Sequence, residues 1–145
     1  MKSQNSNLNR ILALDYGQKK IGVAISDPLK IIAKPLMVII NSSFKSVLSE
    51  INELIDEFQI ETIVIGMPIT LKNKYSKQTE IVVEFVKFLE KNLKINIQTY
   101  DERLTSQMAQ KILISQGIKT GHNKQEIDKV SAAIFLQNFL DDSSK

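Results

Sequence analysis

Carboxylates stand at the ends of two predicted strands and near the start of a predicted helix. Asp15 closes the apolar run ILALD, Asp101 and Glu102 follow INIQTY, and Asp128 lies early in QEIDKVSAAIFLQNFL. Carboxylates that lie close together repel one another, so a cation must compensate them. The chain has no cysteine and one histidine, so that cation would bind oxygen ligands, which Mg²⁺ and Mn²⁺ accept. Paired divalent ions serve in-line attack on a phosphodiester.

Basic side chains stand on the turns and loops predicted beside these carboxylates. Arg103 directly follows Glu102, and its guanidinium could bind a scissile phosphate with two hydrogen bonds. Tyr75 could stack on a base, and the neighbouring lysines could neutralise backbone phosphates. The predicted nucleic-acid-binding lysines are Lys19, Lys20, Lys72, Lys74 and Lys77. The formal net charge of +3 favours a polyanionic partner without demonstrating one.

Composition and length indicate one globular domain. The chain has 145 residues, of which 43% are hydrophobic and 24% charged, and no linker divides it. We expect a single domain over residues 1–145, with flexible tails at 1–8 and 141–145. No segment approaches the roughly 18 uninterrupted apolar residues of a membrane span. The sequence therefore predicts a soluble, cytoplasmic protein with no membrane partner.

Alternating and helical apolar patterns divide the chain into nine predicted elements. The first two strands form a hairpin around the turn GQKK, and the helix after NSS has a good capping cluster. Predicted strands cover 10–16, 20–26, 35–40, 61–68 and 95–100, and predicted helices cover 43–58, 81–89, 104–117 and 125–140. The order is βββαβαβαα.

This order predicts an α/β fold with a five-stranded mixed sheet flanked by helices. Strands joined by short turns run antiparallel, whereas strands separated by helices run parallel. Sites in such sheets lie beyond the carboxyl ends of the parallel strands. The small residues Ser131, Ala132 and Ala133 would let the last helix approach the sheet closely. Asp128 would thereby reach the strand ends that carry Asp15.

Four motifs stand together in the order and spacing of one family. The segments LDYGQKKIGVAISDP, IVIGMP, DERLTS and IDKVSAA resemble the bacterial YqgF (RuvX) family, whose fold is ribonuclease H-like. The resemblance implies a metal-dependent nuclease that processes the 5′ end of pre-16S ribosomal RNA, or alternatively a Holliday junction resolvase. It implies that Asp15, Glu102 and Asp128 hold two Mg²⁺ or Mn²⁺ ions, with Asp101 as a possible substitute for Glu102. The loop after GMP departs from the family by reading ITLKNKYSK.

Other interpretations remain open at this point. Asp15 could close a turn, Glu102 and Arg103 could form a surface ion pair, and Asp128 could favour the helix dipole. The hairpin LALDYGQKKIGVAIS also resembles the first phosphate loop of actin-like and sugar kinases, although the chain lacks a second lobe. A third hypothesis is a nucleic-acid-binding module without catalysis. The sequence leaves open RNA or DNA as substrate, and a monomer or a homodimer.

Overall fold

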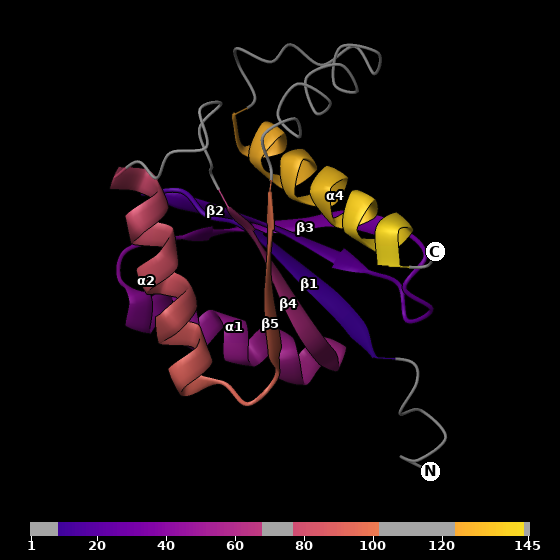
Figure 1. Ribbon diagram of the computed structural model, residues 1–145, viewed down its shortest axis with the longest axis horizontal. Helices are drawn as coiled ribbons and strands as arrows, with labels where there is room; N and C mark the ends of the chain where they lie inside the picture. The colour runs from indigo at the N-terminus through magenta and orange to yellow at the C-terminus, as the bar shows by residue number, and fades with distance from the viewer. Residues whose placement is uncertain (1–8, 68–76, 102–123, 144–145) are drawn as a thin grey trace.

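The computed structural model describes residues 9–67, 77–101 and 124–143. In this part of the chain a five-stranded sheet lies between two helical layers (Figure 1). Helices α1 (Phe44–Phe58) and α2 (Lys77–Asn92) cover one face, and helix α4 (Lys124–Ser143) covers the other. The fold class predicted from the sequence is confirmed. The helix predicted over 104–117 lies outside the described residues, as do positions 1–8 and 144–145 of the predicted tails.

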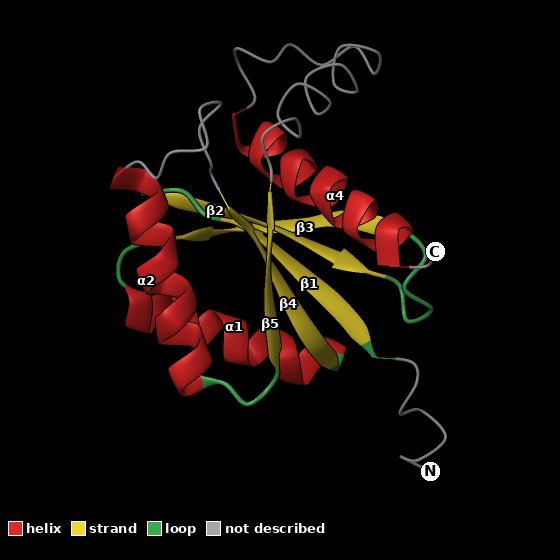
Figure 2. Cartoon of the chain, viewed as in Figure 1, coloured by secondary structure: helices red, strands yellow, loops and turns green. Residues whose placement is uncertain are grey.

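The sheet is mixed, as the element order predicts (Figure 2). Its spatial order is β3-β2-β1-β4-β5. The pairs β1–β2 and β2–β3 are antiparallel, whereas β1–β4 and β4–β5 are parallel. The strands span Arg10–Asp15 (β1), Lys20–Ser26 (β2), Ala33–Ile40 (β3), Ile60–Met67 (β4) and Asn96–Asp101 (β5). The carboxyl ends of β1, β4 and β5 therefore meet at one edge of the sheet.

Strand β3 begins at Ala33, two residues before the predicted start at Pro35. The register of β2 and β3 shifts at this place: Val23 pairs with Met37, but Ala24 pairs with Pro35. Proline cannot donate to a strand ladder, so it is tolerated on an edge strand or at a bulge, and here both conditions hold. The prediction missed the first two residues because proline usually marks a strand boundary.

Helix α1 covers nearly the whole predicted range and buries an apolar stripe against the sheet. Val47, Ile51 and Leu54 are buried, and the partly buried members of the stripe pack against the same cluster. Ser43 caps the helix: its hydroxyl accepts from the Ser46 backbone N–H, while the Ser46 hydroxyl accepts from the Ser43 N–H. This reciprocal cap satisfies two backbone donors that the first turn would leave unpaired.

Helix α2 begins at Lys77, four residues before the predicted start. Its first turn, KQTE, is polar, so it adds no apolar repeat from which the sequence pattern could detect it. On the face of α2 that packs on the sheet, Val82, Phe85 and Leu89 are fully buried. These three side chains complete the larger of two cores, which lies between the sheet and the α1–α2 layer.

Helix α4 packs closely on the opposite face through small residues. Ser131, Ala132 and Ala133 are all buried, and the two alanines join Ala13 and Ala24 in the second core. The predicted close approach is thus confirmed. The helix runs to Ser143, past residue 141, where the sequence analysis placed a flexible tail.

Hydrogen bonds to the last turns explain why the helix continues. The Gln137 amide donates to the Asp141 carboxylate, at 3.1 Å, and the Tyr100 hydroxyl donates to Asp142, at 3.3 Å. Residues 141–143 are therefore helical and tied to the preceding turn and to β5. None of the described helices is both long and apolar enough to span a membrane.

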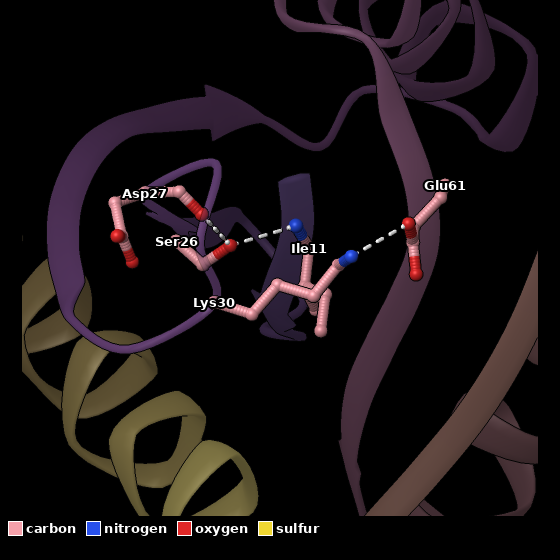
Figure 3. Close-up of polar contacts among 5 residues, drawn as sticks. All are labelled: Ile11, Ser26, Asp27, Lys30 and Glu61. Carbon is pink, nitrogen blue, oxygen red and sulfur yellow. Dashed lines mark hydrogen bonds and ion pairs between the residues drawn. The ribbon is translucent and has the colours of Figure 1, made fainter. Parts of the chain in front are cut away.

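The loop between β2 and β3 is fixed by polar contacts (Figure 3). One Asp27 carboxylate oxygen accepts from the backbone N–H groups of Ile31 and Ile32, at 2.7 and 2.8 Å. Lys30 forms an ion pair with Glu61 of β4, at 3.0 Å. The backbone N–H groups, Ile32 first, lower the pKa of Asp27 below its usual value of 3.8 because they stabilise the charged carboxylate.

Asp27→Asn should therefore remove an acid-sensitive part of the stability. Because the folded state lowers this pKa, the contribution is present above pH 3.8 and is lost as the pH falls through the lower folded value. Urea unfolding at pH 7 and at pH 3 should show wild type more stable than the variant at pH 7, with a smaller difference at pH 3. Asp56→Asn, at an exposed position of α1, is the control. A difference that is equal at both pH values would contradict the assignment.

Candidate functional site

Asp15 is the last residue of β1 and lies at the edge where the parallel strands end. Along β1, Leu12 and Leu14 pack in the core under α1 and α2, whereas Ile11 and Ala13 pack in the core under α4. Side chains alternate between the faces of a strand, so Asp15 is on the α4 side. It is partly buried and pairs with Gly22 of β2.

A pocket of about 610 Å³ opens at this edge. Among the described residues its lining consists of the whole segment from Asp15 to Lys20 together with Gln78 of α2. Lys19 is exposed and Lys20 is partly buried, so the lining carries one carboxylate and two ammonium groups. A carboxylate suits a hard cation and the lysines suit phosphate oxygens. The structure thus brings Asp15, Lys19 and Lys20 together in one pocket.

Gln78 is a lining residue that the sequence analysis missed. It is the second residue of α2 and is partly exposed. A glutamine in the polar first turn of a helix belongs to no motif, so only the packing of α2 beside the hairpin reveals it. Lys77, which was predicted to bind nucleic acid, is the exposed residue before it.

Aromatic packing anchors the β1–β2 turn on one side. Tyr16 is 9% exposed, and its ring centroid lies 4.8 Å from that of Phe85 in α2 and 6.5 Å from that of Phe44 in α1. Phe44 and Phe85 also contact each other, at 5.4 Å. Because Tyr16 directly follows Asp15, this cluster fixes the backbone that carries the carboxylate.

Asn41, between β3 and α1, holds the same turn through hydrogen bonds. Its side-chain Nδ2 donates to the Gly17 carbonyl oxygen, and its backbone N–H donates to the Lys19 carbonyl oxygen, both at 2.8 Å. The sequence analysis treated NSS only as a capping cluster. Asn41 was missed because its partners lie more than twenty residues earlier in the chain.

Gly17 is required by the close approach of the chain to itself. A Cβ placed at this residue would lie well inside the contact distance of the Lys20 carbonyl oxygen, a backbone atom that cannot rotate away. Only glycine lets the turn close in this shape.

Gly17→Ala should force the turn open, because the clash involves backbone. We expect a loss of about 1–3 kcal/mol in the free energy of unfolding, the usual range for overpacking, together with weaker nucleic-acid binding. Urea unfolding and fluorescence anisotropy with a labelled RNA measure the two effects. Gln18→Ala, at the next and exposed position, leaves the backbone unchanged and is the control. If Gly17→Ala had wild-type stability, the turn would tolerate a Cβ at this position.

Strand β5 ends at the same edge with Asp101. Its register pairs Gly66 with Tyr100 and Met67 with Asp101. Tyr100 packs in the α4 core, where its ring stacks on Phe135 at 6.2 Å, whereas Met67 packs against the other core. Burial and the Asp142 carboxylate raise the pKa of Tyr100. Strand alternation therefore directs Asp101 to the α1–α2 face, opposite to Asp15.

Several predicted site residues lie outside the described structure. Asp128 is in the early part of α4, but its side chain is not described. The other predicted positions outside the described residues are Lys72, Lys74, Tyr75, Glu102 and Arg103. Within the described ranges, no three acidic, histidine or cysteine side chains gather as a metal site. The carboxylate set therefore remains a prediction, apart from the position of Asp15.

Comparison with known proteins identifies similar sequences. The family model described as "RuvX: Holliday junction resolvase" matches residues 9–142. A relative from Desulforamulus reducens is 38% identical over 136 residues, covering 94% of this chain and 99% of its own. A relative from Sulfurihydrogenibium is 42% identical over 136 residues, covering 92% of this chain and 91% of its own. Both bear the name "Putative pre-16S rRNA nuclease".

Two solved structures with a similar fold are those of junction resolvases. RuvC of Thermus thermophilus in complex with a Holliday junction substrate superimposes with a TM-score of 0.58 at 11% identity, covering 94% of this chain and 96% of its own. The yeast mitochondrial Holliday junction resolvase Ydc2 superimposes with a TM-score of 0.56 at 11% identity, covering 92% of this chain and 78% of its own. At such low identity the likeness establishes the ribonuclease H-like fold alone.

Proposed function

The chain belongs to the RuvX family, and on that premise we propose that it is a divalent-metal-dependent nuclease that hydrolyses phosphodiester bonds. The observation that carries the proposal is the pocket at the strand ends, where Asp15 lies beside Lys19 and Lys20. A carboxylate for a cation and two ammonium groups for phosphates are among the groups that such a reaction uses.

We propose Asp15, Glu102 and Asp128 as the ligands of Mg²⁺ or Mn²⁺. An open pocket with a carboxylate suits these hard cations, and the chain has no thiolate that would favour a softer metal. When bound, a divalent pair would compensate phosphate charge and lower the pKa of the attacking water. Asp101 faces away from Asp15, which supports Glu102 rather than Asp101 as the ligand from this part of the chain.

The chain's own basic residues would hold the substrate. Lys19 and Lys20 line the pocket, and Lys77 begins the helix that supplies Gln78. These lysines would bind backbone phosphates on either side of the reacting bond, which fixes that bond relative to Asp15. We extend the proposal to the contacts predicted for Lys72, Lys74 and Arg103.

We propose the 5′ end of pre-16S ribosomal RNA as the substrate. The names of relatives that are 38% and 42% identical over nearly the whole chain support it. A role on this RNA implies action in the cytoplasm, and trimming of a leader needs no more than a monomer. The family description and the fold shared with RuvC favour four-way DNA as the second candidate, for which a homodimer would cut two strands symmetrically.

A cleavage assay with two substrates tests the proposal. Purified protein is incubated with Mg²⁺ or Mn²⁺ and either a pre-16S 5′-leader RNA or a four-way DNA junction. We expect metal-dependent cutting of the RNA and its suppression by EDTA. Cutting of the junction alone would establish the second candidate. Binding of either substrate without cleavage under any metal would instead favour a non-catalytic module.

A further inference from the structure

The β1–β2 turn lines the pocket and is also hydrogen-bonded to Asn41, which does not line it. Gly17, Gln18 and Lys19 all line the pocket, whereas Asn41 is absent from its described lining. The two hydrogen bonds of Asn41 reach the turn at the carbonyl oxygens of Gly17 and Lys19. Both carbonyl groups therefore point toward Asn41.

The direction of these carbonyls determines the direction of a backbone N–H. In a trans peptide the C=O and the following N–H point opposite ways, and the described chain has no cis peptide. With the Gly17 carbonyl directed at Asn41, the N–H of Gln18 points away from Asn41. A carbonyl oxygen repels a phosphate, whereas an N–H group attracts it. Because Gln18 lines the pocket, an N–H that Asn41 does not bind suits an anion there.

We propose that Asn41 is a positioning residue, which orients this turn so that the Gln18 N–H and the Lys19 ammonium bind one phosphate group of the nucleic acid. The inference deepens the proposed nuclease function and rests on it for the identity of the ligand. Asn41 does not itself touch the substrate. It acts through the two carbonyl groups that it holds toward itself.

A purely structural role for Asn41 would give different results. In that case its loss would lower the melting temperature but leave the response of the turn to phosphate unchanged. A positioning role requires that the phosphate affinity itself falls. The hydrogen bond from the Asn41 side chain to the Gly17 carbonyl can be removed alone. Asn41→Ala retains the backbone N–H that donates to the Lys19 carbonyl oxygen.

Amide NMR spectra with inorganic phosphate as the probe provide the test. In wild type, the amide signals of Gln18 and Lys19 should shift on titration. In Asn41→Ala the apparent Kd from these signals should rise about three- to tenfold, the factor that one neutral hydrogen bond supplies. Asn52→Ala, at an exposed position of α1, should match wild type. A single-stranded RNA in EDTA should show the same loss for Asn41→Ala by anisotropy.

The outcomes separate this proposal from the nuclease function. No shift at Gln18 in wild type overturns the positioning role, whether or not RNA is cut, and this arm remains valid if Asn41→Ala does not fold. Unchanged affinity in a folded Asn41→Ala overturns it as well. Phosphate shifts that depend on Asn41, in a protein that neither binds nor cuts RNA or DNA, would support the anion site and reject the proposed function.

Discussion

Asp15→Asn should reduce cleavage by about a hundredfold or more at saturating Mg²⁺. Loss of a ligand removes charge stabilisation of several kcal/mol from the transition state, and each 1.36 kcal/mol is tenfold in rate. The fold should survive, because Asp15 is partly exposed at the edge of the sheet. Single-turnover cleavage of the leader RNA measures the rate, and circular dichroism monitors the fold.

The control for this variant makes the same chemical change elsewhere. Asp56→Asn replaces an exposed carboxylate of α1, on a helix that does not line the pocket. It should cleave at the wild-type rate. If Asp15→Asn also cleaved at that rate, Asp15 would be a turn residue, and the metal site would have to lie elsewhere.

Phe85→Ala should give the largest loss of stability. The ring is fully buried, with contacts to Tyr16 and Phe44, and its removal leaves a cavity where the sheet, α1 and α2 meet. Replacement of a buried phenylalanine by alanine costs about 3–5 kcal/mol. Urea unfolding monitored by circular dichroism measures it.

Phe88→Ala is the matched comparison for that change. Phe88 is on the same helix and contacts Phe44, with ring centroids 5.3 Å apart, but it is only partly buried. Its loss should cost less, because a partly exposed ring gives up less apolar burial than a fully buried one. Only Phe85→Ala should also weaken phosphate binding, since Phe85 alone of the two contacts Tyr16. Equal losses of stability in the two variants would contradict the assigned packing.

The fold could be predicted from the sequence because its apolar residues repeat with clear periods. The apolar stripe of α1 forms one face that the sheet must cover, and β1 is a continuous apolar run that must be covered on both faces. Prediction failed where the local signal was polar or ambiguous. The first turn of α2 contains no apolar repeat, and Pro35 marks a strand boundary in most contexts but here occupies a bulge on an edge strand.

The candidate site was only partly predictable. Asp15, Lys19 and Lys20 are neighbours in the chain, so their common pocket follows from one hairpin. Asn41 and Gln78 reach that hairpin through pairing and packing between distant segments, which no short motif encodes. The side to which Asp101 points likewise depends on the register of β5 with β4.

The position of α4 has a consequence for how this chain is synthesised. Gln137 donates to the Ile31 carbonyl and accepts from the Ala33 N–H, across sequence separations of 106 and 104 residues. At about 5–20 residues per second, the ribosome needs roughly 5–20 s to make that intervening chain. During this time the face of the first hairpin that α4 will cover has no partner. Nascent chains that carry this hairpin therefore expose an apolar sheet face to chaperones until the last helix emerges.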